Sequence, residues 1–200
     1  VLHQAALGSV KRSIERPLET NRANVEGTLQ VLQCARAAGV RRVVYASSSS
    51  VYGGSLASPK REQDLGKVLS PYAASKLFCE HYAELFARSL GLECIGLRYF
   101  NVFGPRQSPE GEYAAVIPRW ISSRLNGEQC VIFGDGLTSR DFCYVENVVQ
   151  ANLCAALAPA SCAGKSYNIA LGDETSLNSL YDSIDRAIGG CSAKPEYREF

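Results

Sequence analysis

The chain has 200 residues, of which 46% are hydrophobic and 20% charged, and its 21 basic and 20 acidic side chains give a formal net charge of +1. Because these charges are dispersed, a nucleic-acid-binding surface and a polybasic membrane anchor are excluded as first interpretations. No apolar run approaches the roughly 20 residues that a membrane helix requires, so we expect a cytoplasmic protein that binds neither nucleic acid nor membranes.

Helix and strand patterns alternate through the first half of the chain. Apolar residues recur at helical spacing from Leu18 to Ala38 and predict a helix. A short β-branched strand follows from Arg42 to Ala46 and runs into four serines. A second helix is predicted from Ser70 to Leu90, with Pro71 in its first turn, and Cys94 to Tyr99 is typical of a buried strand. This alternation predicts α/β units around a parallel sheet.

Beyond Gly104 the predicted loops are longer and the elements shorter. We expect helices from Val116 to Leu125, Asn147 to Leu157 and Ser176 to Ile188, and strands from Cys130 to Phe133 and Tyr167 to Ala170. No internal repeat or low-complexity linker interrupts the chain.

The chain has eight cysteines and no methionine. The cysteine spacings include no Cys-X-X-Cys pair, and neither His3 nor His81 belongs to an array that could ligate a metal. We therefore predict no metal site, and reduced cysteines that pack as small core residues, as the apolar neighbours of Cys94 and Cys154 indicate. The missing methionine, with a start at Val1 that resembles the end of a buried strand, predicts a piece of a longer protein.

Tyr72 and Lys76 are four residues apart in the second predicted helix, so their side chains lie on one face. A nearby ammonium favours the phenolate and lowers the tyrosine pKa from about 10 towards neutrality, as a general base for a sugar hydroxyl requires. Surface helices also carry this spacing by chance, so the pair alone is a weak signal.

Four serines, Ser47 to Ser50, follow the first predicted strand at its carboxyl end, where open parallel sheets bind their ligands. Hydroxyls at this place can hold a substrate hydroxyl and relay its proton, whereas an ordinary polar turn would use serines only to form the turn. The order favours a functional interpretation, because the serines are followed by a polar loop and then by the helix that carries Tyr72 and Lys76.

Four segments together resemble the extended short-chain dehydrogenase/reductases that act on nucleotide sugars. They are the serine-rich strand end, SPYAASK, LRYFNVFGPRQ and SRDFCYVENVVQA. Within that family, VLHQAALGSVKRSI, YAAVIPRW and GLTSRDF are most similar to bacterial UDP-N-acetylglucosamine 4-epimerases. The resemblance extends over essentially the whole chain.

The resemblance implies an α/β fold, a Rossmann-like doubly wound parallel sheet with its N-terminal part missing, and a smaller C-terminal substrate-binding lobe. Residues 1–104 would be the distal part of the NAD-binding domain. Residues 105–200 would form most of the lobe, with 141–172 returning to the Rossmann core. The glycine-rich turn and acidic residue that begin such enzymes are not in this sequence, so we expect both ends to be cut. Half a sheet would expose a strand edge, which predicts that the piece alone is poorly soluble and inactive.

The implied reaction is the reversible oxidation of a UDP-sugar at carbon 4, through a 4-keto sugar and with tightly held NAD. By motif match, Tyr72 would take the 4-hydroxyl proton, Lys76 would lower the Tyr72 pKa and hold the nicotinamide ribose, and Ser48 would hydrogen-bond the reacting oxygen. Further cofactor contacts would come from Ala5, Ala6, Asn24 and Tyr99, and substrate contacts from Ser49, Ser50, Asn101, Phe133 and Arg140. Without the resemblance, an ion pair with a neighbouring carboxylate is the favoured role of Arg140.

Related 4,6-dehydratases carry an Asp-Glu pair where this chain has Ser49 and Ser50, and because serines are poor acids and bases, dehydration is disfavoured. We expect a UDP-GlcNAc/UDP-GalNAc 4-epimerase of polysaccharide biosynthesis. The alternatives are a UDP-glucose or UDP-glucuronate 4-epimerase, or a non-catalytic nucleotide-sugar-binding relative. Relatives form homodimers through the helices equivalent to 18–38 and 70–90, and we expect a homodimer here, although a stripe facing the sheet would give the same pattern.

Overall fold

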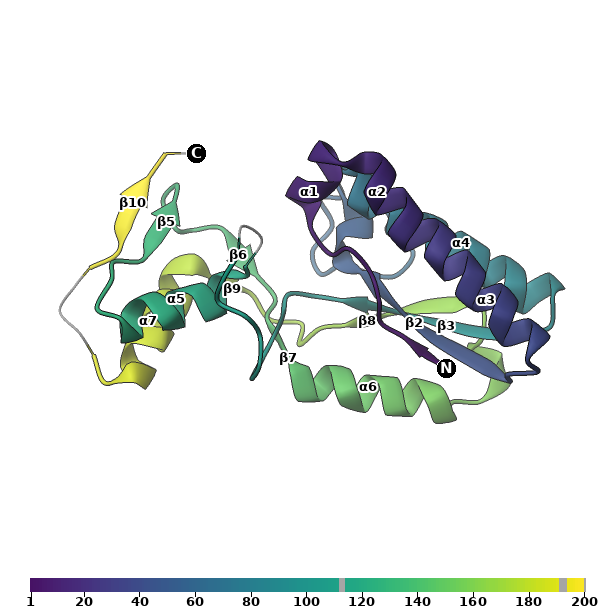
Figure 1. The fold of residues 1–200 in the computed structure, drawn as a ribbon. Helices are drawn as coiled ribbons and strands as arrows, with labels where there is room; N and C mark the ends of the chain where they lie inside the picture. The colour runs from purple at the N-terminus through teal and green to yellow at the C-terminus, as the bar shows by residue number, and fades with distance from the viewer. Residues whose placement is uncertain (112–113, 191–193, 200) are drawn as a thin grey trace. The chain divides into compact units, whose positions relative to one another are not determined.

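Figure 1 shows a computed structural model of the chain, which describes residues 1–111, 114–190 and 194–199. The chain forms two compact units, one made of Val1–Phe100 with Glu146–Ile169 and the other of Asn101–Val145 with Ala170–Phe200. In the described ranges no helix is both long enough and apolar enough to cross a membrane.

The helices and strands predicted from the sequence are present with slightly shifted ends, together with several short elements that were not predicted. The first unit contains β1 (Leu2–His3), α1 (Val10–Glu15), α2 (Pro17–Asn21), the π-helix η1 (Arg22–Glu26), α3 (Gly27–Ala37), β2 (Arg42–Ser48), the 3₁₀-helix η2 (Ser49–Tyr52), α4 (Pro71–Ser89), β3 (Glu93–Tyr99), α6 (Val145–Leu157), the 3₁₀-helix η3 (Ala160–Cys162) and β8 (Lys165–Ile169). The second contains β4 (Val102–Phe103), α5 (Val116–Leu125), β5 (Val131–Phe133), β6 (Ser139–Arg140), β7 (Cys143–Tyr144), β9 (Thr175–Ser176), α7 (Leu177–Ile188) and β10 (Glu196–Arg198).

A four-stranded sheet in the order β1-β2-β3-β8 forms the centre of the first unit, and its neighbouring strands are parallel. Alternate residues of β2 enter different cores, because α3 and α4 cover one face and α6 covers the other (Figure 1). Val43 and Tyr45 pack against α3 and α4, whereas Val44 packs with Ile95 and Ala155. The predicted α/β fold with a doubly wound parallel sheet is confirmed.

The helix predicted from Leu18 to Ala38 is continuous but not uniform, since its middle segment, η1, is a π-helix. A π-segment inserts one residue into the helical turn and changes the face on which the following side chains lie. It contains Asn24, which is 1% exposed. The 3.6-residue periodicity of the sequence did not predict this insertion.

The second unit has its own core, formed by α5, α7 and β5. Ile132 is fully buried there, and the rings of Trp120 and Tyr181 lie nearly perpendicular, with centroids 6.1 Å apart. The strands pair two by two, β10 with β5 and β4 with β7 in parallel, and β6 with β9 antiparallel.

The prediction that the cysteines pack in the core is partly wrong. The buried thiols are those of Cys79, Cys94, Cys130 and Cys143, while Cys162 is half-buried, Cys34 and Cys154 are exposed, and Cys191 lies outside the described residues. Cys154 was assigned to the core from its immediate neighbours, but adjacent residues of a helix point in different directions. Ala155 faces the sheet and Cys154 faces away from it.

The loop between η2 and α4 is closed at its base by Gly53. This residue has a φ of +47°, and a Cβ at this position would overlap the carbonyl oxygen of Lys67. The next residue, Gly54, donates its N–H to the same carbonyl at 3.0 Å. Only glycine therefore combines this backbone conformation with this close approach.

Replacing Gly53 with alanine should lower the free energy of unfolding by more than about 1 kcal/mol, because the chain must both strain and open the loop. Urea denaturation followed by circular dichroism measures this change. Gly54→Ala is the matched control, since a Cβ there would meet its nearest neighbours only at 3.9 Å. Equal stability of the two variants would contradict the prediction.

Candidate active site

The carboxyl end of β2 and the first turns of α4 bring Ser48, Tyr72 and Lys76 together. Ser48 ends the strand and caps η2, where its Oγ accepts hydrogen bonds from the N–H and the hydroxyl of Ser50 at 3.2 and 3.0 Å. Ser70 caps α4 by accepting from the N–H of Ala73 at 3.1 Å, which places Tyr72 in the first turn. The Ser48 hydroxyl lies near enough to the Tyr72 phenol to lower the pKa of that phenol.

Lys76 lies one turn further along α4 and is only 5% exposed. Its Nζ donates to the carbonyl oxygen of Ala46 in β2 at 2.8 Å and lies 6.0 Å from the centroid of the Tyr72 ring. Burial lowers the pKa of Lys76, because the ammonium has lost most of its hydration.

The expectation that Lys76 depresses the pKa of Tyr72 is wrong for the protein by itself. Burial raises the pKa of Tyr72 above its ordinary value, and the nearby Ser48 hydroxyl offsets this rise only in part. The spacing of Tyr72 and Lys76 is as predicted, but spacing alone does not report how strongly both groups are desolvated. The resting form of Tyr72 at neutral pH is therefore the phenol.

Asn24 was predicted to contact a cofactor, but its side chain is used within the protein. Its Oδ1 accepts from the N–H of Leu7 at 2.8 Å, and its Nδ2 donates to the Leu7 carbonyl at 3.2 Å and to Ser75 Oγ at 3.0 Å. These bonds fix the segment that follows β1 against α4. The small side chains of Ala5 and Ala6 lie on this segment and are exposed, so Asn24 positions the predicted cofactor-binding backbone.

Tyr99 ends β3 and belongs to a closed ring of hydrogen bonds. Its hydroxyl donates to Gln4 Oε1 at 2.9 Å and accepts from Asn152 Nδ2 at 2.8 Å. Gln4 Nε2 in turn donates to Asn152 Oδ1 at 3.0 Å. Sequence reasoning missed Gln4 and Asn152, because a ring between β1, β3 and α6 is formed only by the folded chain.

The predicted substrate residues are divided between the units. Ser49 and Ser50 lie half-buried in η2, in the first unit. In the second unit, Phe133 ends β5 and is 48% exposed, and Arg140 is exposed in β6 with its guanidinium donating to the Ser139 carbonyl at 2.7 Å.

Asp141 is the carboxylate next to Arg140 in the sequence. Its two oxygens accept from the backbone N–H groups of Leu171 and Gly172 at 3.0 and 2.8 Å, and its carbonyl accepts from Asn101 Nδ2 at 2.9 Å. The Asp141 carboxylate thus bonds backbone N–H groups, and the Arg140 guanidinium bonds the Ser139 carbonyl, so the two do not form the alternative ion pair.

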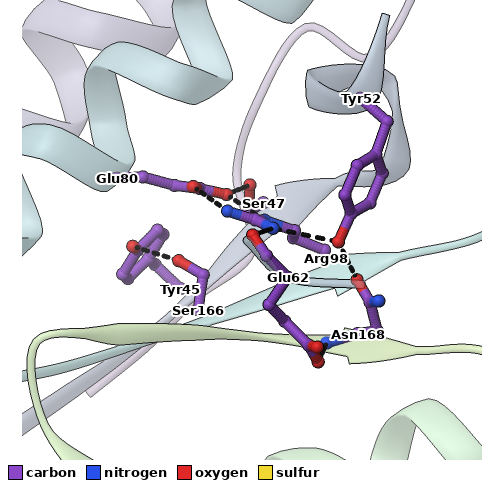
Figure 2. A network of polar contacts seen from close by, with 8 residues as sticks. All are labelled: Tyr45, Ser47, Tyr52, Glu62, Glu80, Arg98, Ser166 and Asn168. Atoms are coloured by element: carbon purple, nitrogen blue, oxygen red, sulfur yellow. Dashed lines mark hydrogen bonds and ion pairs between the residues drawn. The ribbon is translucent and has the colours of Figure 1, made fainter. Parts of the chain in front are cut away.

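In the first unit, a buried ion pair between Glu80 and Arg98 lies next to Ser47, the residue before Ser48 (Figure 2). Neither residue was predicted to matter. Two signals in the sequence point to them. One is a glutamate one turn after Lys76 in the same helix, and the other is an arginine within the otherwise apolar segment from Cys94 to Tyr99. A groove of about 520 Å³ also lies along α4 and β8, lined among others by His81, Glu84 and Lys165. Because none of the predicted site residues lines it, the candidate site rests on chemistry and not on cavity size.

Known proteins resemble the chain over its whole length. A model of the NAD dependent epimerase/dehydratase family matches residues 1–170. A UDP-glucose 4-epimerase of Mycolicibacterium smegmatis is 40% identical over 201 residues, which is 100% of this chain and 62% of that protein.

Two solved structures extend this comparison. The UDP-N-acetylglucosamine 4-epimerase of Methanobrevibacter ruminantium, in complex with UDP-N-acetylmuramic acid, superimposes with a TM-score of 0.95 at 40% identity and covers 100% of this chain and 63% of its own. The UDP-glucose 4-epimerase of Thermus thermophilus, in complex with NAD, has a TM-score of 0.86 at 33% identity over 99% of this chain and 63% of its own. The chain thus spans less than two thirds of the length of these relatives.

The raised pKa of Tyr72 predicts how stability depends on pH. Because the unfolded chain loses this phenolic proton at lower pH than the folded chain, the stability that neutral Tyr72 contributes is complete below about pH 10 and is lost as the pH rises through the folded-state pKa. Between about pH 9 and about pH 11, Tyr72→Phe should therefore lose less free energy of unfolding than the wild type.

Urea denaturation at a series of pH values measures this difference. Tyr197→Phe controls for the loss of a phenol, because Tyr197 is 53% exposed. Parallel losses in the wild type and Tyr72→Phe would contradict the prediction.

Proposed function

The chain belongs to the NAD dependent epimerase/dehydratase family, and we propose that the protein interconverts UDP-sugars that differ in configuration at carbon 4, with UDP-GlcNAc and UDP-GalNAc as the preferred pair. The observation that carries this proposal is the meeting of Ser48, Tyr72 and Lys76 at the carboxyl end of β2. A hydroxyl, a phenol and an ammonium at one strand end are the groups needed to hold an alcohol and move its proton.

The residues around β1 and α4 fit NAD. Ala5 and Ala6 leave the backbone after β1 open to close approach, and the bonds from Asn24 to Leu7 hold that backbone in place. The Lys76 ammonium can donate to ribose hydroxyls in addition to the Ala46 carbonyl. When bound, NAD would supply the hydride acceptor and donor and, in its oxidised form, a positive charge.

Tyr72 takes the proton from the sugar 4-hydroxyl and later returns it to the same oxygen. Ser48 hydrogen-bonds that oxygen and, because its hydroxyl lies near the phenol, holds the oxygen within reach of Tyr72. Because burial favours the neutral phenol, a positive charge close to Tyr72 is required to lower its pKa before it can act as a base. Lys76, held in place by Ala46, does not outweigh the burial of Tyr72 by itself, so the positive charge of oxidised NAD would have to add to it.

The choice of sugar rests on similarity and on the serines. The relative that superimposes at a TM-score of 0.95 is a UDP-N-acetylglucosamine 4-epimerase. Ser49 and Ser50 provide neither the acid nor the base that a dehydratase needs. Arg140 is an exposed guanidinium suited to a diphosphate. UDP-glucose is the second candidate, because the Mycolicibacterium relative, at the same 40% identity, is a UDP-glucose 4-epimerase.

The test supplies UDP-GlcNAc, UDP-GalNAc, UDP-glucose and UDP-glucuronate separately to the NAD-loaded protein as its gene encodes it, and resolves the products by chromatography. We expect the N-acetylated pair to interconvert with the highest kcat/KM. Tyr72→Phe should lower kcat by about 100-fold or more, since it removes the group that moves the proton. Tyr82→Phe, on the same helix, should retain the wild-type rate. No conversion of UDP-GlcNAc with NAD bound would contradict the proposal.

We further propose a homodimer that pairs the surfaces of α2 and α4. Support comes from apolar side chains that these helices expose, Leu18 at 75%, Phe78 at 55% and Leu85 at 41%. Size-exclusion chromatography with light scattering should give twice the chain mass. Phe78→Glu combined with Leu85→Glu should give a monomer, because charges oppose burial of this surface. A wild type that is monomeric at micromolar concentration would contradict the homodimer.

A further inference from the structure

Glu80 and Arg98 form a bidentate ion pair between α4 and β3, beneath the turn that carries the serines (Figure 2). Arg98 Nε donates to Glu80 Oε1 at 2.9 Å and Nη2 donates to Oε2 at 2.7 Å. The two side chains are only 5% and 9% exposed. Replacing such a buried pair with apolar residues is often neutral or stabilising, so stability alone does not explain it.

The pair holds the chain on both sides of Ser48. On the preceding side, the Ser47 hydroxyl donates to Glu80 Oε1 at 2.5 Å. On the following side, Arg98 Nη1 donates to the hydroxyl of Tyr52, the last residue of the helix that Ser48 caps, at 2.9 Å. Ser47, just before Ser48, and Tyr52, at the end of η2, are thus tied to the same ion pair (Figure 2).

The same pair fixes α4 against β2. Tyr72, Lys76 and Glu80 are spaced by one turn and share a face of the helix. Lys76 contacts the Ala46 carbonyl and Glu80 contacts Ser47, so consecutive residues of β2 are held by consecutive turns of α4. Ser48 follows Ser47 directly in the chain, and Tyr72 lies one turn before Lys76 in α4, so the same contacts limit how the two can move apart.

The pair also connects to the long loop and to β8. Arg98 Nη1 donates to the Glu62 carbonyl at 2.8 Å, and the Tyr52 hydroxyl donates to Asn168 Oδ1 at 2.5 Å. The Asn168 N–H in turn donates to Glu62 Oε1 at 2.9 Å. Groups from β2, η2 and the loop therefore hydrogen-bond the ion pair directly, and β8 is joined to it through Tyr52 and Glu62.

We propose that Glu80 and Arg98 are positioning residues that set the distance and orientation of Ser48 relative to the Tyr72 phenol. The effect of this positioning on reaction rate rests on the proposed function, whereas the positioning does not. A small displacement of a proton-transferring group is enough to lower a rate by about 100-fold, so the pair controls kcat without touching the substrate.

The main test uses Glu80→Leu with Arg98→Met, which removes both charges together and leaves no unpaired charge buried. Tyrosines replaced by meta-fluorotyrosine give fluorine NMR signals, and the Tyr72 signal is the one lost in Tyr72→Phe. Ser48→Ala gives the signal position without the Ser48 hydroxyl beside the phenol. We call Glu80→Leu with Arg98→Met the paired variant. In the folded paired variant we expect the Tyr72 signal to move to the position that it has in Ser48→Ala.

The matched control is Tyr45→Phe, which removes a buried hydroxyl from the same strand. The Tyr45 hydroxyl bonds Ser166 at 3.3 Å and is separate from the ion-pair contacts in Figure 2. The Tyr45→Phe variant should have the Tyr72 signal position and the kcat of the wild type. An unmoved Tyr72 signal in the folded paired variant would overturn the proposal.

If the paired variant does not fold, Ser47→Ala with Tyr52→Phe tests the same point, because it breaks the links to both flanks and keeps the ion pair. It should move the Tyr72 signal in the same way, and restoring a hydroxyl with Ser47→Thr in the Tyr52→Phe background should move it part of the way back. No movement in this variant overturns the proposal.

Kinetics of the NAD-loaded protein with UDP-GlcNAc separate the two proposals. We expect kcat of the folded Glu80→Leu/Arg98→Met variant to fall by about tenfold or more while KM changes by less than about twofold, since the proposal gives neither residue a contact with substrate. An unchanged kcat would overturn the effect on rate. A wild type that converts no UDP-sugar, with a signal that still moves in the paired variant, would refute the proposed function and support the positioning.

Discussion

Burial of β2 on both faces determines where polar groups can be placed in the first unit. Val43, Val44 and Tyr45 are at most 2% exposed, and layers of helices lie above and below them. At the start of the strand, Arg42 pairs with Glu93 and donates to the last turn of α6. At its carboxyl end come the serines. Polar chemistry is thus confined to the strand ends, and α4 supplies the groups that meet it at one of them.

The electrostatics of the candidate site follow from this confinement. Both Tyr72 and Lys76 are desolvated. Burial raises the pKa of Tyr72 and lowers the pKa of Lys76, so it favours the neutral form of each side chain. Two groups that oppose ionisation in this way respond strongly to a new charge in their neighbourhood, because little water is present to screen it. The site therefore has a protonated phenol at rest, and a positive charge placed beside it would lower its proton affinity.

Local patterns in the sequence predicted the order of strand, serines and helix, and the helical spacing placed Tyr72 beside Lys76. Features that depend on contacts between distant segments were not predictable in this way. Glu80 and Arg98 are 18 residues apart and meet only because α4 crosses back over the sheet. The role of Asn24 depends on a π-helical insertion, and the direction of the Tyr72 pKa shift depends on burial, which the four-residue spacing does not report.

The contact between Glu62 and Asn168 has a further consequence. β8 is the last strand of the described sheet, and the Glu62 carboxylate takes the N–H of Asn168 on its outer side, while Asn168 Nδ2 donates to the Lys60 carbonyl at 3.0 Å. An unpaired strand edge is a template for lateral pairing with another chain, and this loop caps it with a side chain that cannot extend the ladder. The segment that steadies the serine turn thus also occupies part of the edge along which another strand could pair.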